Sequence, residues 1–370
     1  MEYDADVLIV GAGPAGAIAA LTAARLGRRA LLLEAKRFPR VKPCAGGVSP
    51  RARGVLRRLE LWDDVERAGY PIRGARFVTP GGRDTTLVGA ASALVVPRTT
   101  LDPLLARAAV AAGAELREAT AVRGPLVEDG RVAGVRTDGG PLRARWVVAA
   151  DGANTRFSLD PRPRRTIQTC MAWFEGRFFE PGVLELLFLP ELAPHYGWLF
   201  PESDTRANLG ICVEAERRAG SPIRDLFARF LERHYARRLA GAAACGPWRG
   251  HPIVPSVAVE HHAFPGVLLA GEACRLVNIA TGEGISYAME SGQLAAEAIC
   301  EALRSGEDPR TTAARYAARL RRRLAAPYLV SDLFRRRGAP LLEGLARLGA
   351  RPWFRRLARQ APAATGSSAC

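Results

Sequence analysis

The chain has 370 residues, of which 48% are hydrophobic, and this composition excludes a disordered or low-complexity protein. Its formal net charge of +16 is carried almost entirely by arginine, because lysine occurs only as Lys36 and Lys42. Such a bias often follows genome composition, so we do not take it as evidence for a nucleic-acid partner and expect none.

The cysteines and the N-terminal segment bear on the cellular compartment of the protein. The seven cysteines form no Cys-x-x-Cys pair and are odd in number, which predicts reduced thiols and no metal site. The first apolar run is interrupted by Gly11, Gly13 and Pro14, so it fits neither a signal peptide nor a membrane span. We therefore expect a cytoplasmic location, with membrane association left open by the C-terminal segment described below.

Residues 6–37 predict a strand, a glycine-rich turn, a helix and a second strand. In the turn, Gly11 permits a tight bend, Gly13 lets a pyrophosphate approach the backbone, and Gly16 lets the helix pack on the sheet. The helix N-terminus offers N–H groups and partial positive charge to phosphates. Glu34, at the end of the second strand, can accept hydrogen bonds from a ribose. The unit therefore predicts a dinucleotide site.

Residues 42–52 read KPCAGGVSPRA and follow this unit closely. Gly46 and Gly47 allow close approach of the backbone to a ligand. Two interpretations of Cys44 stay open: a proton donor or redox thiol, or a small buried side chain that fills space.

The following segments continue in an α/β pattern. Residues 99–113 predict a helix, and residues 115–157 predict a small antiparallel meander with Asp-Gly turns at 129–130 and 138–139. Residues 165–260 are rich in aromatic and β-forming pieces and predict a second, sheet-based domain. Residues 266–303 return to a strand, a loop and a helix.

The C-terminal segment is helical in pattern and strongly basic. Residues 301–370 contain 15 arginines and 5 acidic residues, a net charge of +10. This segment is either a solvated helical face or a surface for anionic lipid or an acidic partner.

Two distal motifs resemble the flavoprotein hydroxylase superfamily, which has the p-hydroxybenzoate hydroxylase-like fold. They are VVAADGANTRF (147–157) and LLAGEACRLVNIATGEGISYAMESGQLAAEAI (268–299). The resemblance implies FAD as cofactor, with Asp151 in the first motif and a ribityl contact from Gly271-Glu272. It also implies a helix start at 282–285 that faces the flavin ring. Arg98 matches a cofactor-contacting position, although a helix-capping surface arginine is an equal alternative.

Within this superfamily the chain most resembles the geranylgeranyl reductase family, whose members reduce isolated C=C bonds in prenyl chains. Three motifs carry the resemblance: Lys42, Cys44, Gly46 and Gly47; Tyr196-Gly197-Trp198-Leu199-Phe200-Pro201 with the later Gly210; and Thr281 to Ile285. Three departures leave the substrate open: Glu272 replaces an Asp, Cys212 replaces a Gly, and Asn278-Ile279-Ala280 lacks the usual Pro.

We therefore expect an α/β fold: a Rossmann-type FAD-binding domain (1–160 with 262–305), an inserted β-sheet substrate domain (161–261) and a C-terminal basic helical region (306–370). The predicted cofactor contacts are Gly11, Gly13, Pro14, Ala15, Gly16, Glu34, Ala35, Cys44, Ala45, Gly46, Gly47, Arg98, Asp151, Gly271, Glu272, Gly282, Gly284 and Ile285. Cys44 is the candidate catalytic residue, with the space-filling thiol as the alternative. Tyr196, Trp198, Phe200 and Gly210 are expected to line an apolar substrate pocket, with ordinary sheet packing as the alternative.

The expected activity is reduction of C=C bonds in a prenyl, polyene or other apolar small molecule by flavin hydride transfer. No second dinucleotide fingerprint is present, so NAD(P)H or a reduced ferredoxin-type donor would bind only transiently. One alternative is an FAD-dependent monooxygenase or oxidase that tailors an aromatic or polyketide-like natural product. Another is a non-catalytic flavin-binding protein that docks on a membrane through its basic C-terminal region.

Overall fold

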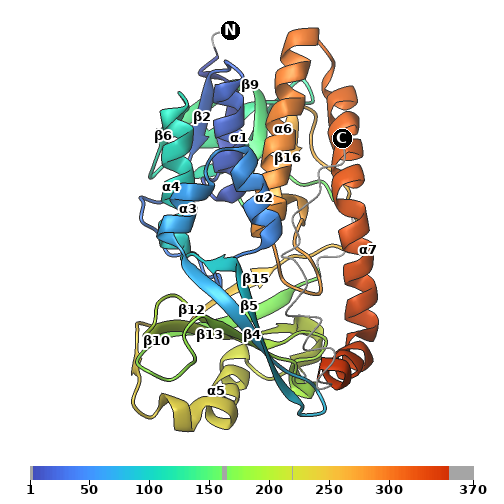
Figure 1. The fold of residues 1–370 in the computed structure, drawn as a ribbon. Helices are drawn as coiled ribbons and strands as arrows, with labels where there is room; N and C mark the ends of the chain where they lie inside the picture. The colour runs from blue at the N-terminus through green and yellow to red at the C-terminus, as the bar shows by residue number, and fades with distance from the viewer. Residues whose placement is uncertain (1–2, 161–164, 219, 350–370) are drawn as a thin grey trace. The chain divides into compact units, whose positions relative to one another are not determined.

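The computed structural model describes residues 3–160, 165–218 and 220–349 (Figure 1). Packing divides the chain into two compact units. Unit 1 comprises Met1–Lys42, Arg98–Arg164 and Val254–Val330, and unit 2 comprises Pro43–Pro97, Arg165–Ile253 and Ser331–Cys370. These units are defined by contacts between residues. The expected division into three parts, with boundaries after residues 160, 261 and 305, was based on function and stays a prediction.

Unit 1 is built on a mixed sheet that contains the predicted nucleotide unit. Its strands are β1 (Ala5–Val10), β2 (Ala30–Leu33), β6 (Glu115–Arg117), β7 (Val122–Glu128), β8 (Arg131–Thr137), β9 (Gly140–Ala149) and β16 (Val267–Leu269). They follow the order β6-β2-β1-β9-β8-β7, and β16 also pairs with β9. The strands β6, β2, β1, β9 and β16 are parallel, whereas β7, β8 and β9 form the predicted antiparallel meander. The apolar runs of β1 and β2 are buried, as parallel strands require.

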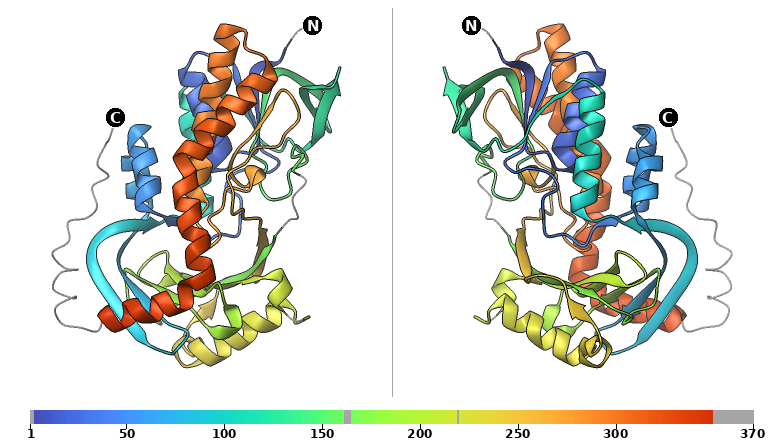
Figure 2. Two further views of the ribbon diagram at one scale, coloured as in Figure 1. Left: turned by 90° about the vertical axis from the view of Figure 1, so that its right-hand side faces the viewer. Right: turned by 90° about the vertical axis from the view of Figure 1, so that its left-hand side faces the viewer.

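The helices of unit 1 pack on this sheet around α1. They are α1 (Pro14–Arg25), α4 (Arg98–Ala111), the short 3₁₀ turn η3 (Gly271–Cys274) and α6 (Ile285–Ser305), and α1 packs against both α4 and α6. A Cβ at Gly292 of α6 would collide with the carbonyl of Ala15 in α1, so this glycine sets how closely the two helices approach. Helix α7 (Pro309–Gly349) follows α6, and Arg319 pairs with Glu301 at 2.8 Å where the two helices lie side by side (Figures 1 and 2).

Unit 2 is built on a larger, mainly antiparallel sheet. Its strands are β3 (Gly47–Val48), β4 (Tyr70–Val78), β5 (Asp84–Val95), β10 (Ile167–Glu175), β11 (Val183–Leu187), β12 (Gly197–Pro201), β13 (Arg206–Glu214), β14 (Ala243–Ala244) and β15 (Arg249–Ile253). They follow the order β14-β10-β13-β12-β11-β4-β5-β3, and β15 also pairs with β10. The helical segments are α2 (Pro50–Arg58), α3 (Trp62–Ala68), α5 (Ile223–Leu239) and the 3₁₀ turns η1 (Pro190–Leu192) and η2 (Ala215–Arg218).

The two faces of the β10-β13-β12 region have different partners because side chains alternate along a strand. On one face, Leu199 and Leu209 pack with Phe227 and Phe230 of α5. On the other face, Trp198 packs with a separate apolar cluster described below. The predicted β-rich segment is thus a sheet with one helix-covered face.

Two general features of the described residues bear on function. No helix among them has the length and hydropathy needed to cross a bilayer. The six cysteines within the described part of the chain are all free thiols. The predicted helical region 306–370 is described as far as residue 349, and the remainder lies outside the described residues.

Candidate active site

The glycine turn between β1 and α1 has the geometry of a phosphate cradle. Gly11 has φ +93°, and a Cβ there would lie 2.6 Å from the carbonyl oxygen of Ala150. A Cβ at Gly16 would collide with the carbonyl of Gly11. Helix α1 begins at Pro14 with Gly13 as its N-cap, without a capping side chain and without an acidic residue in its first turn. Its N-terminal N–H groups and dipole therefore favour an anion at this turn.

Glu34 lies directly after β2 and turns its carboxylate toward the same turn. It is 6% exposed, and its Oε2 accepts a hydrogen bond from the Ala12 N–H at 3.2 Å. Its Oε1 accepts one from the Lys36 N–H at 3.1 Å. These bonds hold the carboxylate beside the cradle, where a ribose would lie after the pyrophosphate. Ala35, the next residue in the chain, is exposed.

A buried ionic network joins Glu34 to the start of α4. Asp102 has no exposed surface and pairs with Arg98 twice, at 2.5 Å (Nε–Oδ1) and 2.7 Å (Nη2–Oδ2). Arg40 bridges the carboxylates of Asp102, at 2.8 Å, and Glu34, at 3.0 Å. The Nη2 of Arg98 would lie 3.3 Å from a Cβ at Gly13. The guanidinium of Arg98 is thus held beside the cradle. The side chain is 11% exposed, so Arg98 is not a surface arginine.

The first distal motif follows β9, the strand beside β1. The Cα of Asp151 lies 3.2 Å from the position of a Cβ at Gly11, so this motif borders the same cradle. Neighbouring protein atoms reduce the hydration of the Asp151 carboxyl and raise its pKa to about 6, although the residue as a whole is exposed. Hydrogen bonds from Thr155 and the Arg156 backbone act on this pKa in the opposite direction.

The second distal motif packs against the first turn of α1. Gly271 has φ +61°, its N–H donates to the Ser291 Oγ at 2.8 Å, and a Cβ there would lie 3.1 Å from the Cβ of Ala15. Glu272, in the position where an Asp was expected, accepts a hydrogen bond from the Val254 N–H at 3.0 Å. The longer side chain is therefore held by the backbone of a neighbouring segment.

A tight loop leads into α6. The side chain of Asn278 accepts hydrogen bonds from the N–H groups of Ala280 and Thr281, both at 3.1 Å. Gly282 has φ +66° and donates its N–H to the Asn278 carbonyl at 2.9 Å. Helix α6 then begins at Ile285 with Gly284 as N-cap and without a capping side chain. This is the predicted helix start, and its N–H groups and dipole suit the electron-rich edge of a reduced flavin.

The cradle fits a dinucleotide on steric and electrostatic grounds. Side chains at the turn would fill space that the glycines leave open, and the guanidinium of Arg98 supplies positive charge beside Gly13. Glu34, Arg98 and the two uncapped helices would hold FAD, which supplies hydride chemistry when bound. The individual contacts of the predicted cofactor residues stay predictions.

In unit 2 the predicted substrate residues gather on one face of the sheet. Tyr196, Trp198 and Phe200 alternate along β12 and its preceding residue, and they share a cluster with the buried side chains of Met171 and Cys212. Trp198 is paired across the sheet with Gly210, and a Cβ at Gly210 would collide with the indole ring. Gly210 is thus required by the way Trp198 lies over β13. We call Tyr196, Trp198 and Phe200 the aromatic wall.

The Cys44 loop lies against this wall. The thiol of Cys44 is half-buried and accepts a hydrogen bond from the Gly46 N–H at 3.4 Å. Gly46 has φ +78°, and a Cβ there would lie 2.8 Å from the Val96 carbonyl oxygen. A Cβ at Gly47 would lie 3.1 Å from the ring of Phe200. Both glycines are therefore needed for the loop to pack here.

Asn208 ties the loop to the wall. This side chain is completely buried, and its Oδ1 accepts a hydrogen bond from the Trp198 indole at 2.8 Å. Its Nδ2 lies within hydrogen-bonding distance of the Ala45 carbonyl at 3.2 Å, and it also reaches the Phe200 carbonyl at 3.3 Å and the Glu202 carboxylate at 3.2 Å. Asn208 thus connects one wall residue with the residue after Cys44.

Sequence reasoning missed Arg40, Asp102 and Asn208. A signal was present for Asp102, because it follows Arg98 by four residues at the start of the helix predicted over 99–113, and this is the spacing of an ion pair. Arg40 and Asn208 act on partners far away in the chain, and their sequence neighbourhoods carry no comparable signal.

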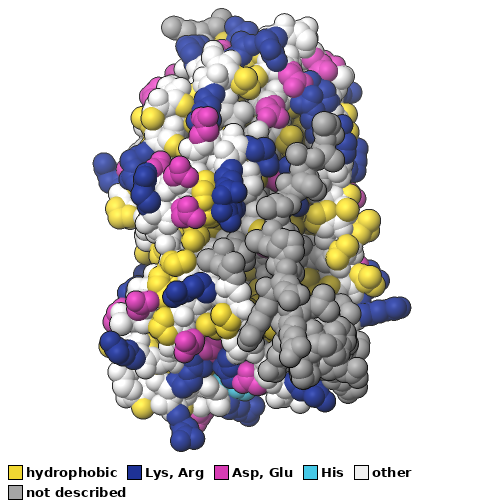
Figure 3. Space-filling view, in the orientation of Figure 1, with side chains coloured by type: hydrophobic (Ala, Val, Ile, Leu, Met, Phe, Trp, Pro, Cys, Tyr) yellow, Lys and Arg dark blue, Asp and Glu magenta, His cyan; other side chains and the backbone are white. Residues whose placement is uncertain are grey.

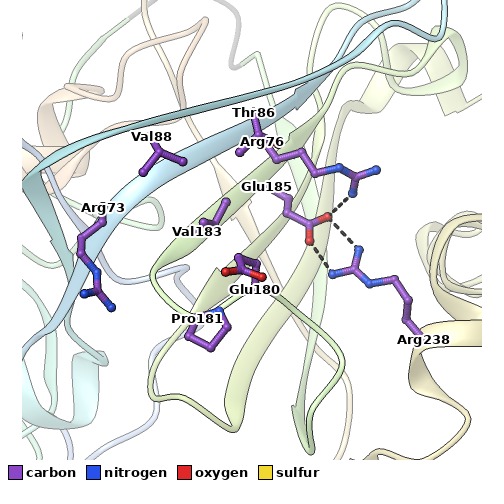
Figure 4. A pocket seen from close by; sticks show the side chains of 9 residues that line it. All are labelled: Arg73, Arg76, Thr86, Val88, Glu180, Pro181, Val183, Glu185 and Arg238. Atoms are coloured by element: carbon purple, nitrogen blue, oxygen red, sulfur yellow. Dashed lines mark hydrogen bonds and ion pairs between the residues drawn. The ribbon is translucent and has the colours of Figure 1, made fainter. Parts of the chain in front are cut away.

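A separate hollow in unit 2 is lined by charged and aliphatic side chains together. It has a volume of about 790 Å³ and is lined by Arg73, Arg76, Thr86, Val88, Glu180, Pro181, Val183, Glu185 and Arg238 (Figure 4). Glu185 pairs with Arg76 at 2.6 Å and with Arg238 at 2.5 Å, as the dashed lines show. Burial alone would raise the pKa of Glu185, but these ion pairs hold it below its usual value.

Comparison with known proteins supports the geometry. The FAD binding domain family model matches residues 4–327. Digeranylgeranylglycerophospholipid reductase 1 of Methanopyrus kandleri is 33% identical over 333 residues, covering 85% of each chain. Menaquinone reductase of Mycolicibacterium smegmatis is 34% identical over 328 residues, covering 80% of this chain and 76% of that protein. A solved geranylgeranyl bacteriochlorophyll reductase-like protein of Thermoplasma acidophilum has a TM-score of 0.83 at 24% identity, covering 96% of this chain and 95% of that one.

The parallel sheet, the glycine cradle and the matched domain define a flavoprotein, and the chain is an FAD-dependent oxidoreductase with the expected α/β fold. It belongs to the geranylgeranyl reductase family, as the sequence motifs indicated.

Proposed function

We propose that this enzyme reduces C=C bonds of a prenyl, polyene or other apolar substrate with hydride from FAD. The observation that carries the proposal is the aromatic wall, in which Trp198 lies across Gly210 on the sheet face opposite the α5 cluster. An apolar chain needs such a surface, since it offers little else to recognise. The relatives named above support the substrate class, because their names denote reductases of a geranylgeranyl lipid and of a quinone.

The reaction needs one hydride and one proton for each double bond. We assign the hydride to reduced FAD and the proton to the half-buried Cys44 thiol, whose loop packs against Phe200 at Gly47. An isolated alkene is a poor hydride acceptor, so exclusion of water and a positioned proton donor would both contribute. After turnover the thiolate would regain its proton from water, and the oxidised flavin would be reduced again.

The electron donor and location are parts of the same proposal. NAD(P)H or a reduced ferredoxin-type protein would supply the electrons, bound only transiently. The free thiols of the described residues are consistent with a reducing compartment such as the cytoplasm. An apolar substrate would be delivered from a membrane, and the basic C-terminal region would contact that membrane.

Anaerobic single turnover tests the reaction. The FAD-loaded protein is reduced with dithionite, mixed with a geranylgeranyl compound without oxygen, and followed by flavin absorbance and product mass. Reoxidation of the flavin with addition of two hydrogens per double bond is the expected result. Absence of saturated product, together with oxygen insertion in air, would instead establish the monooxygenase alternative.

Two single cysteine variants test whether Cys44 is the proton donor. Cys44→Ala should lower the rate of flavin reoxidation by substrate by about 100-fold, the usual contribution of general acid catalysis. Cys245→Ala is the matched control, because Cys245 is also a half-buried free thiol of unit 2, and it should keep the wild-type rate. Full turnover by Cys44→Ala would remove the thiol from the reaction without affecting the assignment of the substrate.

A further inference from the structure

The outer side of α7 carries an apolar patch. Leu329, Val330 and Leu333 are 69%, 68% and 57% exposed, and Ala326 one turn earlier is also exposed. Leu329 and Leu333 are four residues apart, so they are neighbours on one helical face. The opposite face of α7 is buried and carries Leu320, Leu324, Tyr328 and Ser331. We call Ala326, Leu329, Val330 and Leu333 the α7 patch.

Arginines flank the α7 patch at both ends. Arg322 and Arg323 precede it, Arg336 and Arg337 follow it, and all four are exposed. At 100° per residue, Arg322 and Arg337 lie within about 40° of the centre of the patch, so they project from the same side of the helix. Figure 3 shows hydrophobic side chains gathered at the right-hand edge, where α7 runs in Figure 1, with basic side chains above and below.

The acidic residues near the patch are already engaged with arginine. Asp332 is half-buried and pairs with Arg335 at 3.1 Å and with Arg336 at 2.7 Å. Arg323 pairs with Glu290 at 3.6 Å. The charge at the ends of the patch therefore stays positive on balance, so the complementary partner is anionic.

An anionic lipid surface matches this arrangement. Apolar side chains in the centre of the face would enter the boundary between headgroups and acyl chains, as they do in interfacial helices. Long arginine side chains at both ends would extend to lipid phosphates while their stems stay in the apolar layer. An acidic protein partner would satisfy the arginines, yet would leave three exposed aliphatic side chains without a matching apolar surface.

We propose that the α7 patch docks this enzyme on an anionic lipid bilayer. The inference narrows the membrane contact of the proposed function to one face of one helix. Its test measures binding without turnover, so its failure is distinguishable from failure of the reductase proposal.

The experiment is vesicle sedimentation with the full-length, FAD-loaded protein. One set of vesicles contains phosphatidylcholine alone, and the other is an equal mixture with phosphatidylglycerol. Wild type should bind the anionic vesicles, bind phosphatidylcholine more weakly, and lose binding as salt is raised. The triple variant Leu329→Ser, Val330→Ser, Leu333→Ser should lower the partition coefficient on anionic vesicles at least about tenfold.

A second variant keeps the apolar side chains in place and so tests the charges separately. Arg322→Gln with Arg337→Gln should lower binding to anionic vesicles by about 30-fold, because each basic residue at such a surface contributes about 1 kcal/mol. The matched control is Arg229→Gln with Arg237→Gln, two exposed arginines of α5, which should bind within about twofold of wild type if the site is local.

Three results would overturn the proposal. The first is that the wild-type protein does not bind anionic vesicles. The second is that the triple variant binds them as strongly as wild type does. The third is a dimer in sedimentation velocity that the triple variant lacks, without vesicle binding, which would make the patch an interface between copies.

Discussion

The indole N–H of Trp198 donates a hydrogen bond to the buried side chain of Asn208 at 2.8 Å. The same amide contacts the carbonyl of Ala45, the residue after Cys44, at 3.2 Å. One side chain of β13 thus holds both the aromatic wall and the loop that carries the proposed proton donor. Because an unpaired indole N–H or backbone carbonyl is costly in such a buried place, the wall and the loop are coupled through Asn208.

This coupling predicts the behaviour of two variants at position 208. Asn208→Leu should lower the free energy of unfolding by about 2 kcal/mol and raise the KM for an apolar substrate several-fold, because Trp198 loses its partner and the loop is released. Asn208→Asp keeps an acceptor for Trp198 but loses the donor toward Ala45. It also places a second carboxyl group beside that of Glu202 in a fully buried site, so it should destabilise the protein at least as much as Asn208→Leu does.

Steady-state kinetics and urea unfolding check this prediction. FAD affinity is the internal control, since both variants leave unit 1 unchanged. Arg107→Leu, an exposed site in unit 1 away from the cradle, should be neutral. Equal KM and kcat in wild type and Asn208→Leu would show that the hydrogen bonds only support the fold.

Asp102 should be essential for the arrangement of the two arginines near the cradle. Asp102→Asn removes the charge that pairs with Arg98 and Arg40, which should destabilise the apoprotein by about 3 kcal/mol. FAD affinity should fall at least about tenfold, because Arg98 would no longer be held beside Gly13. Isothermal titration with FAD and chemical unfolding measure the two effects.

Arg98→Lys separates charge from geometry at this site. Lysine keeps the positive charge but lacks the planar fork that fits both oxygens of Asp102, so FAD affinity should fall between that of wild type and Asp102→Asn. Arg117→Lys, whose pair with Glu115 is exposed, is the control and should bind FAD normally. Wild-type FAD affinity in Asp102→Asn would contradict a positioning role for the network.

Alanine substitutions at two glycines with positive φ separate the cost of backbone strain from the cost of a steric clash. Gly11→Ala combines a strained backbone with a Cβ 2.6 Å from the Ala150 carbonyl oxygen, so it should abolish measurable FAD binding and destabilise the protein by about 2–4 kcal/mol. Gly27→Ala has a similar φ of +73° but no neighbouring atom within 4 Å. It should cost only about 1 kcal/mol and leave FAD binding intact. Flavin retention on purification and thermal unfolding report the difference.

His261 predicts acid sensitivity of unit 1. Its Nε2 accepts a hydrogen bond from the Leu269 N–H at 3.0 Å, and burial, with a smaller effect of His262, lowers its pKa to about 4. The folded state therefore favours neutral His261, and this contribution is fully present above the ordinary pKa of 6.5. It should be lost as the pH falls through that value toward about 4, by at most about 3 kcal/mol.

Urea unfolding across this pH range tests the assignment. His261→Gln can still accept the hydrogen bond but does not titrate, so its unfolding free energy should depend less steeply on pH. His262→Gln, a more open neighbour that pairs with Glu260, is the control and should follow wild type. Identical pH dependence in wild type and His261→Gln would contradict the assignment.

Some of this protein could be predicted from its sequence because the relevant physics is local. A strand followed by Gly-x-Gly-x-x-Gly and a helix strongly favours one kind of turn, and the structure has φ +93° at Gly11, as that turn needs. The position of Glu34 at the end of β2 and the start of α6 at Ile285 follow from the same short-range rules. Alternation along β12 likewise predicted that Tyr196, Trp198 and Phe200 share a face.

Other features were decided only by the tertiary structure, because their partners are far apart in the chain. Nothing near Arg40 indicates that it bridges Glu34 and Asp102, and nothing near Asn208 indicates a contact with Ala45, 163 positions earlier. A buried charge or amide must find partners wherever folding brings them, and sequence spacing carries no record of that choice. The sequence alone thus determined the family and the cofactor cradle, whereas packing determined which buried groups hold Arg98, Trp198 and the Cys44 loop in place.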